Sequence, residues 1–434
     1  MRWGVVVTSA AALLLAGCAV NPVTGKSQLD LLGEAQEIEL GRTLYPGTIQ
    51  ESLGPLPDEA VQAMVRRVGQ AVAAVGHRPA LPYEFTAVDE PEVNAFALPG
   101  GKICITRGLL SRLESEDGVA AVLAHEVGHV TARHAVASYN RQILAGVVAV
   151  GAGIYMESSD SELRGLVGLG AVLGTQLALA FYSREQERQA DALGLDYAVK
   201  AGYSPRGMIE THKVLLALQQ GKVSLVERMF ASHPMSAERL ATAQREVEGL
   251  PPEIQARPLR VEPYRAVAAP LLAARPAWDL AAEGRRLLAA KKVREAEAKL
   301  AEAARREPRA GMIRTLHAVS LVMAERKGEA AAEAREGARL AEHAFLAQFL
   351  AGQILLDPDA AAALERLDRA ESLLPGVAQV AYLRGVALER LKRPREAAQA
   401  YRTAVERDPQ GQVGAAAARR LQELGYRPAE GGRP

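Results

Sequence analysis

Residues 115–129 decide how this chain folds, and they read SEDGVAAVLAHEVGH. Ser115 is a typical helix N-cap, acidic residues follow it, and apolar residues recur at helical spacing, so the stretch predicts a helix. Positions four apart lie on one helix face, so His125 and His129 can direct ring nitrogens at one metal ion, at about 2.0–2.1 Å for zinc. Glu126 would lie beside the metal without binding it. The alternative is a surface helix with two incidental histidines.

A third ligand is predicted about sixty residues further on. A catalytic zinc site needs three protein ligands and one open position. Residues 181–191, FYSREQERQAD, predict a second helix, and Glu187 is the best candidate on it. Asp191 lies four residues later on the same face, where it could accept a hydrogen bond from a ligating histidine. Glu185, on the opposite side, is the weaker candidate, and a solvated helix face with internal ion pairs is the alternative.

The two motifs, H-E-x-x-H and S-R-x-x-E-x-x-A-D, resemble the gluzincin metallopeptidase family that contains the CAAX prenyl proteases and HtpX. Two other stretches are similar to the same family. Residues 94–110, NAFALPGGKICITRGLL, resemble its hairpin beside the cleft, and residues 232–234, SHP, with Arg239, resemble its C-terminal motif. The resemblance covers residues 30–250.

The resemblance implies the roles of the ligands and the base. It implies that His125, His129 and Glu187 bind one Zn²⁺ per chain and that Glu126 is the general base. A zinc ion lowers the pKa of its bound water to about 7, so that the water can attack a peptide carbonyl at neutral pH.

The resemblance also implies roles for the residues around the metal. Asp191 would orient His125, while His233 and Arg239 would lie near the metal, where either could donate a hydrogen bond to the oxyanion. In some members of the family the histidine of the last motif reaches the zinc and closes the site. The alternative for His233 is a polar residue that starts a helix before Pro234.

The other histidines are not predicted to be ligands. His134, five residues after His129, should point away from the ligand face and is expected to be an ordinary polar position. Nothing in their sequence surroundings recommends His77, His212, His317 or His343.

Three short segments are predicted to be strands, namely residues 83–88, 94–98 and 101–106, with residues 99–101 as a turn. An edge strand beside the metal-binding helix could pair with an extended peptide through main-chain hydrogen bonds. The candidate substrate-binding residues are Asn94, Ala95 and Phe96. A purely structural hairpin is the alternative.

The N-terminus resembles a bacterial lipoprotein signal. The apolar run of residues 5–15 is shorter than the roughly 20 residues that span a bilayer, and it ends in LAGC. Cleavage after residue 17 would leave Cys18 lipidated, and Ala19 favours the outer membrane over the inner one. The only other cysteine, Cys104, is expected to be a buried, inert thiol, and no intrachain disulfide is expected.

Two apolar stretches, residues 143–156 and 166–181, are also too short for a transmembrane prediction. Their glycines and alanines favour closely packed helices. The alternative is an exposed apolar hairpin that contacts lipid or a membrane-protein substrate.

From residue 277 alanine recurs with a period near 34, which is typical of tetratricopeptide repeats. Three copies share one register of small, large, small, large, small and proline positions: Gly284, Leu287, Ala296, Leu300, Ala303 and Pro308; Ala351, Ile354, Ala363, Leu367, Ala370 and Pro375; Gly385, Leu388, Ala397, Tyr401, Ala404 and Pro409. Residues 311–343 should form a fourth, degenerate copy. An ordinary alanine-rich helical bundle is the alternative.

The predicted fold is α+β, a mainly helical zinc metallopeptidase domain with a small edge sheet, followed by an all-α tetratricopeptide-repeat solenoid. The predicted order is a signal peptide (1–17), a tether (18–29), the metallopeptidase domain (30–250), a proline-marked linker (251–276), the repeats (277–425) and a tail (426–434).

The predicted function is a zinc endopeptidase of the cell envelope, in the periplasm and anchored to the outer membrane. It would hydrolyse misfolded or stalled outer-membrane and periplasmic proteins, and its repeats would dock to outer-membrane assembly machinery. The alternative is a chaperone or assembly scaffold whose peptidase site is closed. The 434-residue chain has a net charge of +1, which argues against nucleic-acid binding.

Overall fold

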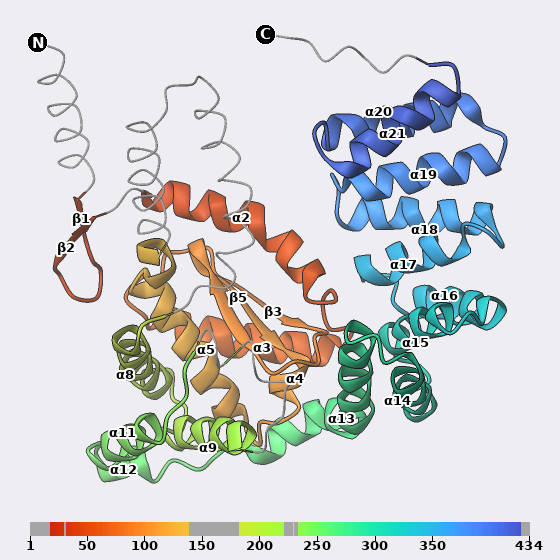
Figure 1. Cartoon of the computed structure of the whole chain (residues 1–434). Helices are drawn as coiled ribbons and strands as arrows, with labels where there is room; N and C mark the ends of the chain where they lie inside the picture. Colours follow the sequence, from red (N-terminus) through yellow and green to blue (C-terminus); the bar gives the residue numbers. More distant parts are fainter. Residues whose placement is uncertain (1–17, 30–31, 139–181, 221–228, 230–232, 427–434) are drawn as a thin grey trace, which may run out of the picture. The chain divides into compact units, whose positions relative to one another are not determined.

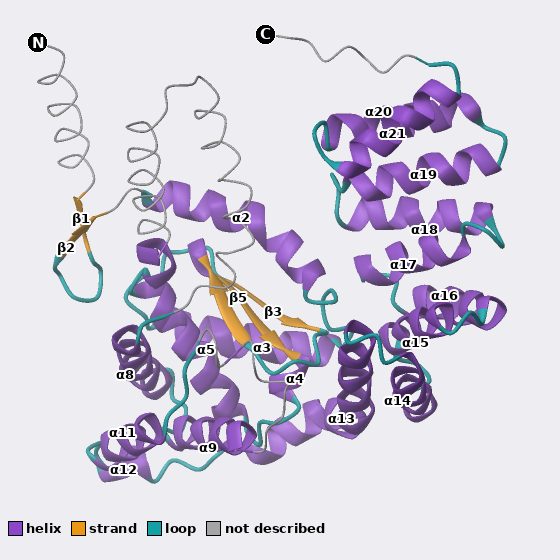
Figure 2. Cartoon of the chain, in the orientation of Figure 1, coloured by secondary structure: helices purple, strands orange, loops and turns teal. Residues whose placement is uncertain are grey.

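The computed structural model describes residues 18–29, 32–138, 182–220, 229 and 233–426 (Figure 1). The chain divides into two compact units, Met1–Thr48 with Asp58–Leu272, and Ile49–Pro57 with Ala273–Pro434. Helices predominate in both, and a small sheet lies in the first unit (Figure 2). The described residues therefore have the predicted α+β fold followed by an all-α repeat region.

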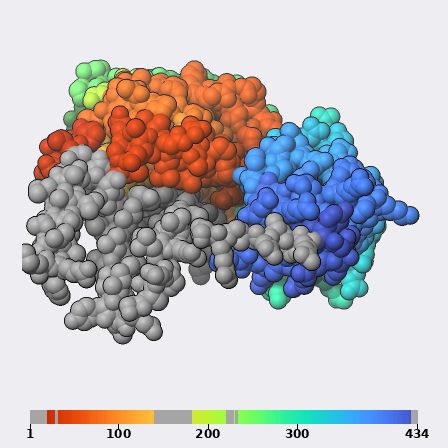
Figure 3. All heavy atoms as spheres, turned by 90° about the horizontal axis from the view of Figure 1, so that it is seen from above, coloured from red at the N-terminus to blue at the C-terminus, as the bar shows by residue number. Residues whose placement is uncertain are grey.

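The first unit begins with a hairpin of β1 (Cys18–Val20) and β2 (Ser27–Leu29), which pair antiparallel. The sequence predicted only a tether here. The side-chain amide of Asn21 donates a 3.1 Å hydrogen bond to the carbonyl of Ala132, so this segment is attached to the unit. Two helices follow, α2 (Glu34–Glu51), which lies on the surface in Figure 3, and α3 (Glu59–Ala74).

The predicted strands are all present, within one residue of their predicted starts. They are β3 (Glu84–Val88), β4 (Ala95–Leu98) and β5 (Lys102–Thr106), in the order β3-β5-β4. β5 is parallel to β3 and antiparallel to β4, so β4 is an edge strand among the described residues. The turn between β4 and β5 is the 3₁₀ segment η1 (Pro99–Gly101), whose two glycines have positive φ.

The helix predicted from residue 115 is α5 (Glu116–Thr131), and each of its residues is buried. The hydroxyl of Ser115 caps it by accepting a 3.0 Å hydrogen bond from the amide of Gly118. Around α5 pack the sheet, α3 and two further helices, α8 and α9 (Figure 1). The remaining helices of this unit are α4 (Arg107–Leu110), α8 (Arg184–Lys200), α9 (Arg206–Gln220), α11 (Ala237–Glu248) and α12 (Pro252–Gln255).

The repeat region consists of stacked helix pairs, as predicted. A Cβ on Gly284 would lie 2.6 Å from Leu300, and a Cβ on Gly385 would lie 2.5 Å from Tyr401, so small and large positions of the pattern interlock. In the third copy the glycine against Leu367 is Gly352, one residue after the predicted Ala351. The helices are α13 (Val261–Ala289), α14 (Val293–Arg306), α15 (Gly311–Met323), α16 (Lys327–Leu340), α17 (Phe345–Leu355), α18 (Ala360–Leu373), α19 (Ala378–Arg390), α20 (Pro394–Arg407) and α21 (Gln412–Glu423).

The linker predicted at residues 251–276 is wrong, because α12 and the first half of α13 occupy it. Pro263 lies in the first turn of α13, where the missing N–H costs nothing. Pro270 and Pro276 lie in its interior, where each removes one helical hydrogen bond. Alanine and leucine around them favour a helix, and burial of apolar side chains on α13 offsets that loss.

Residues 49–57, predicted to belong to the 30–250 domain, pack instead within the second unit. Leu53 is 3% exposed and lies in the apolar cluster of that unit that contains Trp278. The side-chain amide of Gln50 donates to the carbonyl of His343 at 3.2 Å and accepts from the amide of Phe345 at 2.8 Å. Leucine burial thus outweighs sequence proximity in deciding where this segment packs.

Among the described residues, no helix has both the length and the hydropathy needed to span a membrane. The predicted signal peptide (1–17) and both apolar stretches (143–156 and 166–181) lie outside the described residues.

Cys104 should be unreactive in the folded protein. Its side chain on β5 is fully buried, and burial raises the pKa of its thiol, so both access and the thiolate are lacking. In a Cys18→Ser chain, we expect a chromogenic disulfide reagent to react with Cys104 on the order of 100-fold more slowly in native protein than in urea-unfolded protein. Equal rates would show that the thiol is accessible.

Candidate metal centre

The structure brings His125, His129 and Glu187 together at the contact of α5 and α8. The Nε2 atoms of the two histidines are 3.0 Å apart, and Glu187 Oε1 is 3.3 Å from His129 Nε2. Glu187 Oε2 lies 3.6 Å from His125 Nε2. All three side chains are buried, and with His233 they form a group whose ligand atoms lie within 4.8 Å of one another. Such a group can hold a metal ion. Glu185, the weaker candidate, is exposed and pairs with Arg188.

His233 belongs to this group. Its Nδ1 is 2.9 Å from Glu187 Oε1 and 3.5 Å from His125 Nε2. The helix after it, α11, is capped by the hydroxyl of Ser236, which accepts from the amide of Arg239 at 3.2 Å, so His233 does not start that helix. It therefore occupies the place of a possible fourth ligand.

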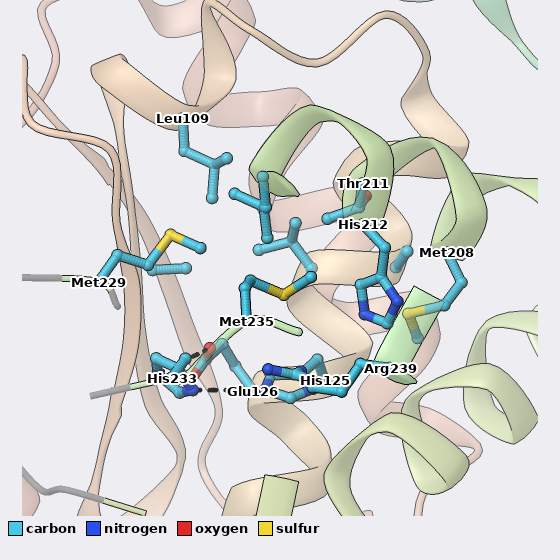
Figure 4. A pocket seen from close by; sticks show the side chains of 14 residues that line it. Leu109, His125, Glu126, Met208, Thr211, His212, Met229, His233, Met235 and Arg239 are labelled. Carbon is cyan, nitrogen blue, oxygen red and sulfur yellow. Dashed lines mark hydrogen bonds and ion pairs between the residues drawn. The ribbon is translucent and has the colours of Figure 1, made fainter. Parts of the chain in front are cut away.

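Glu126 lies beside the group rather than in it. One oxygen, Oε1, is 3.8 Å from His233 Nε2, and these two residues are joined in Figure 4. The other, Oε2, is buried and has no hydrogen-bond partner among the described residues. Burial raises the pKa of Glu126, which makes the carboxylate a stronger base than an exposed glutamate.

The charges of the group suit a cation. Burial alone would raise the pKa of Glu187, but His233 and His129 hold it well below its ordinary value. Burial lowers the pKa of His129, so its imidazole is neutral and keeps a lone pair. An ionised carboxylate and a neutral imidazole are the forms in which these side chains bind metals.

Asp191 and Arg239 lie behind the ligands. Asp191 Oδ1 is 3.0 Å from His125 Nδ1, the contact that the resemblance implied. Arg239 donates two 2.7 Å hydrogen bonds to Asp191, and its Nη1 lies 2.8 Å from Glu187 Oε2. Burial alone would raise the pKa of Asp191, but the hydrogen bonds from His125, His212 and Arg239 hold it well below its ordinary value. Arg239 thus contacts the carboxylates of both Asp191 and Glu187. That Arg239 or His233 donates a hydrogen bond to an oxyanion stays a prediction.

The prediction that His134 is an ordinary polar position is wrong. This side chain is 4% exposed, and its Nδ1 lies 2.8 Å from Nδ1 of His129. The prediction assumed a continuous helix, but α5 ends at Thr131 and Arg133 adopts a left-handed conformation, with φ of 57°, that redirects the chain. Helical spacing alone gives no signal for such a turn.

Two further neighbours of the ligands were not predicted. His212 on α9 is buried, with Nε2 3.5 Å from Asp191 Oδ1. The ring of Tyr182 stacks on that of His129 with centroids 3.9 Å apart. A tyrosine directly before the capping Ser183 of α8 was visible in the sequence, but nothing in the pattern assigned it to the site.

The candidate substrate-binding residues lie at the edge of the sheet. Asn94 directs its backbone inward, because its amide donates to the hydroxyl of Thr106 and its carbonyl accepts from the amide of Thr106. Hydrogen-bonding directions alternate along a strand, so Phe96 also faces β5, whereas Ala95 and Ala97 direct their N–H and C=O groups away from it. No other described strand pairs with the outward groups of Ala95 and Ala97, and both residues are buried.

A small apolar pocket adjoins the group (Figure 4). It has a volume of about 40 Å³, and His125, Glu126 and His233 form one side of it. Its other side includes methionine and leucine side chains, namely Leu109, Met208, Leu215, Met229 and Met235.

Residues 59–247 match the model of Peptidase family M48. The chain contains an M48 peptidase domain. M48 is a family of metallopeptidases, and the match encloses His125, Glu126, His129, Glu187 and His233.

Curated relatives share this domain. The beta-barrel assembly-enhancing protease of Yersinia pestis is 29% identical over 234 residues, which are 53% of this chain and 48% of that protein. The mitochondrial metalloendopeptidase OMA1 of Schizosaccharomyces pombe is 32% identical over 191 residues, which are 44% of this chain and 53% of that protein. This chain spans about half the length of each of these two relatives.

Among solved structures, the tetratricopeptide-repeat protein YrrB matches with a TM-score of 0.32 and 18% identity, covering 49% of this chain and 99% of that one. MamA from Desulfovibrio magneticus RS-1 matches with a TM-score of 0.30 and 21% identity, covering 34% of this chain and 92% of that one.

Gly194→Ala should damage the M48 domain at its metal centre. A Cβ at Gly194 would lie 2.9 Å from the backbone nitrogen of His125, so α5 and α8 must move apart. We expect a loss of about 1–3 kcal/mol in stability, measured by hydrogen exchange of the α5 amides. The control is Gly249→Ala at the end of α11, where the nearest atoms are 3.5 Å away and a change within about 0.5 kcal/mol is expected. Equal effects would contradict the close packing.

Proposed function

We propose that this chain is a zinc-dependent endopeptidase. The observation that supports it is the spacing of the buried ligand atoms. In a tetrahedral site with bonds of about 2.0–2.1 Å, neighbouring ligand atoms lie roughly 3.4 Å apart. The Nε2 atoms of His125 and His129 are 3.0 Å apart, and each lies 3.3 or 3.6 Å from one of the two oxygens of Glu187, separations close to those that a zinc site needs.

Glu126 would handle the protons. When bound, zinc supplies a Lewis acid that polarises the peptide carbonyl and acidifies a water molecule. The unpartnered Oε2 of Glu126 is placed to accept the proton of the attacking water and then to deliver it to the leaving amine. The raised pKa of Glu126 favours the first of these steps, because a stronger base takes the proton more readily near neutral pH.

The substrate would be an extended polypeptide. Its main chain would pair with the outward groups of Ala95 and Ala97 on β4, and an apolar side chain would enter the methionine-lined pocket beside Glu126. Unfolded or stalled chains expose both features, whereas a compact folded protein hides them.

We further propose that the protein acts in the cell envelope, in the periplasm and held at the outer membrane by lipid on Cys18. The lipoprotein-like N-terminus supports this location, and the Yersinia relative is named for its role in β-barrel assembly. Its substrates would be misfolded or stalled outer-membrane and periplasmic proteins. The repeats would dock the peptidase to these substrates or to assembly machinery.

The position of His233 favours a second candidate, a chaperone or assembly scaffold with a closed site. With Nδ1 2.9 Å from Glu187 Oε1, His233 stands where a fourth ligand would exclude the attacking water. The two candidate functions make different predictions: the peptidase needs proteolysis for its role in the cell, whereas the scaffold does not.

Glu126→Gln should abolish peptidase activity and keep the metal. The amide cannot accept the proton of water, so cleavage of an unfolded peptide should fall by about 10²–10⁴-fold while zinc content stays unchanged. Glu185→Gln, on the exposed face of α8, is the matched control and should change neither. If Glu126→Gln fully restored envelope function in cells that lack the protein, the scaffold would be the main role.

Purified protein should contain about one zinc ion per chain. Glu187→Gln or His129→Ala removes one of three protein ligands, so we expect metal analysis to find zinc lost from both variants. Protein purified without chelators that contains no zinc would refute the zinc assignment.

A further inference from the structure

We propose that His134 and Gln189 are positioning residues that hold His129 in the tautomer that can bind the metal. This inference rests on the proposed zinc site, because it concerns how one of the ligands is oriented. It assigns a role to a pair of side chains that lies behind the ligands and touches neither the metal position nor the pocket.

The three side chains form one continuous chain of hydrogen bonds. His129 Nδ1 is 2.8 Å from His134 Nδ1, and His134 Nε2 is 3.0 Å from Gln189 Oε1. His129 and His134 are both buried, and Gln189 is half-buried at the outer end. The chain therefore leads from the ligand to the edge of the domain.

With both rings neutral, the acceptor at the outer end sets the direction of every hydrogen bond in the chain. An amide oxygen only accepts, so His134 carries its proton on Nε2 and presents a lone pair at Nδ1. His129 must then donate from Nδ1, which leaves the lone pair on Nε2, the atom that faces Glu187 and His125. If the amide of Gln189 were reversed, each proton would shift by one place, and His129 Nε2 would carry a proton and could not bind a metal.

Two features of the backbone bring His134 and Gln189 into this position. The left-handed turn at Arg133 brings His134 under His129, and Glu37 holds that turn through a 3.1 Å contact with Nε of Arg133. Gln189 lies two residues after the ligand Glu187, so one helix supplies both a ligand and the end of the chain.

Each histidine ligand thus has its own partner, and the two partners differ in charge. His125 donates to the ionised Asp191, whereas His129 donates to a neutral imidazole. The buried centre already contains the carboxylates of Glu126, Glu187 and Asp191 against the single guanidinium of Arg239. A neutral partner orients His129 without adding another buried negative charge.

The test measures zinc affinity by competition with a chelator in the full-length protein. Loss of such a partner weakens metal binding by about 10–100-fold, so His134→Ala and Gln189→Leu should both show a loss in that range. Gln189→Glu keeps an oxygen acceptor at a half-buried position and should bind zinc as tightly as the wild type. Arg188→Gln, an exposed neighbour on α8, is the control and should change nothing.

A second readout separates positioning from packing. In metal-free wild-type protein, nitrogen NMR should find the proton of His129 on Nδ1, and in Gln189→Leu it should find a mixture of tautomers. A packing role would instead favour leucine over glutamate at position 189. Unchanged zinc affinity in His134→Ala and Gln189→Leu would overturn this inference alone, whereas wild-type protein that binds no zinc would overturn the zinc site as well.

Discussion

The metal centre depends on how closely two helix backbones approach one another. Gly194 of α8 lies against the backbone of His125, and Gly128 of α5 lies against the carbonyl of Ala190, with no room for a side chain at either point. Only this distance lets a glutamate from α8 reach the space between two histidines of α5. Gly194 and Gly128, which have no side chains, therefore determine where the metal-binding side chains lie. The capping of both helices, by Ser115 and by Ser183, then fixes where along each helix the ligands fall.

Once the helices are this close, buried charge becomes the next constraint. Ionised carboxylates in a dry interior are stable only when they are paired and hydrogen-bonded. Arg239 meets this requirement by contacting Asp191 and Glu187 together, so a residue expected near the reacting atoms acts first as a counter-ion. The cost of burying another negative charge also explains why His129 contacts a neutral histidine rather than another acid.

Much of this arrangement could be predicted from the sequence, because its signals are local. Cap residues and helical spacing predicted α5 and α8, alternation predicted the three strands, and the recurring small and large positions predicted helix pairs such as the one in which Gly284 meets Leu300. The failures have non-local or backbone causes. His134 is brought back by one left-handed residue, Leu53 packs into an apolar cluster that contains residues more than two hundred positions away, and α13 continues through prolines because its burial offsets their cost. None of these leaves a periodic pattern in the chain.

The edge strand β4 lies beside the candidate site, and its unpaired backbone groups can take part in binding substrate. An unpaired strand edge exposes hydrogen-bonding groups, and proteins usually cover or shorten such edges. β4 is short, yet its outward groups at Ala95 and Ala97 are unpaired by any other described strand, and Ala95 also lines the pocket beside Glu126. Under the proposed function, the substrate would supply the strand that pairs with these groups. Pairing would bring its peptide bond past Glu126, whose Oε2 has no hydrogen-bond partner among the described residues.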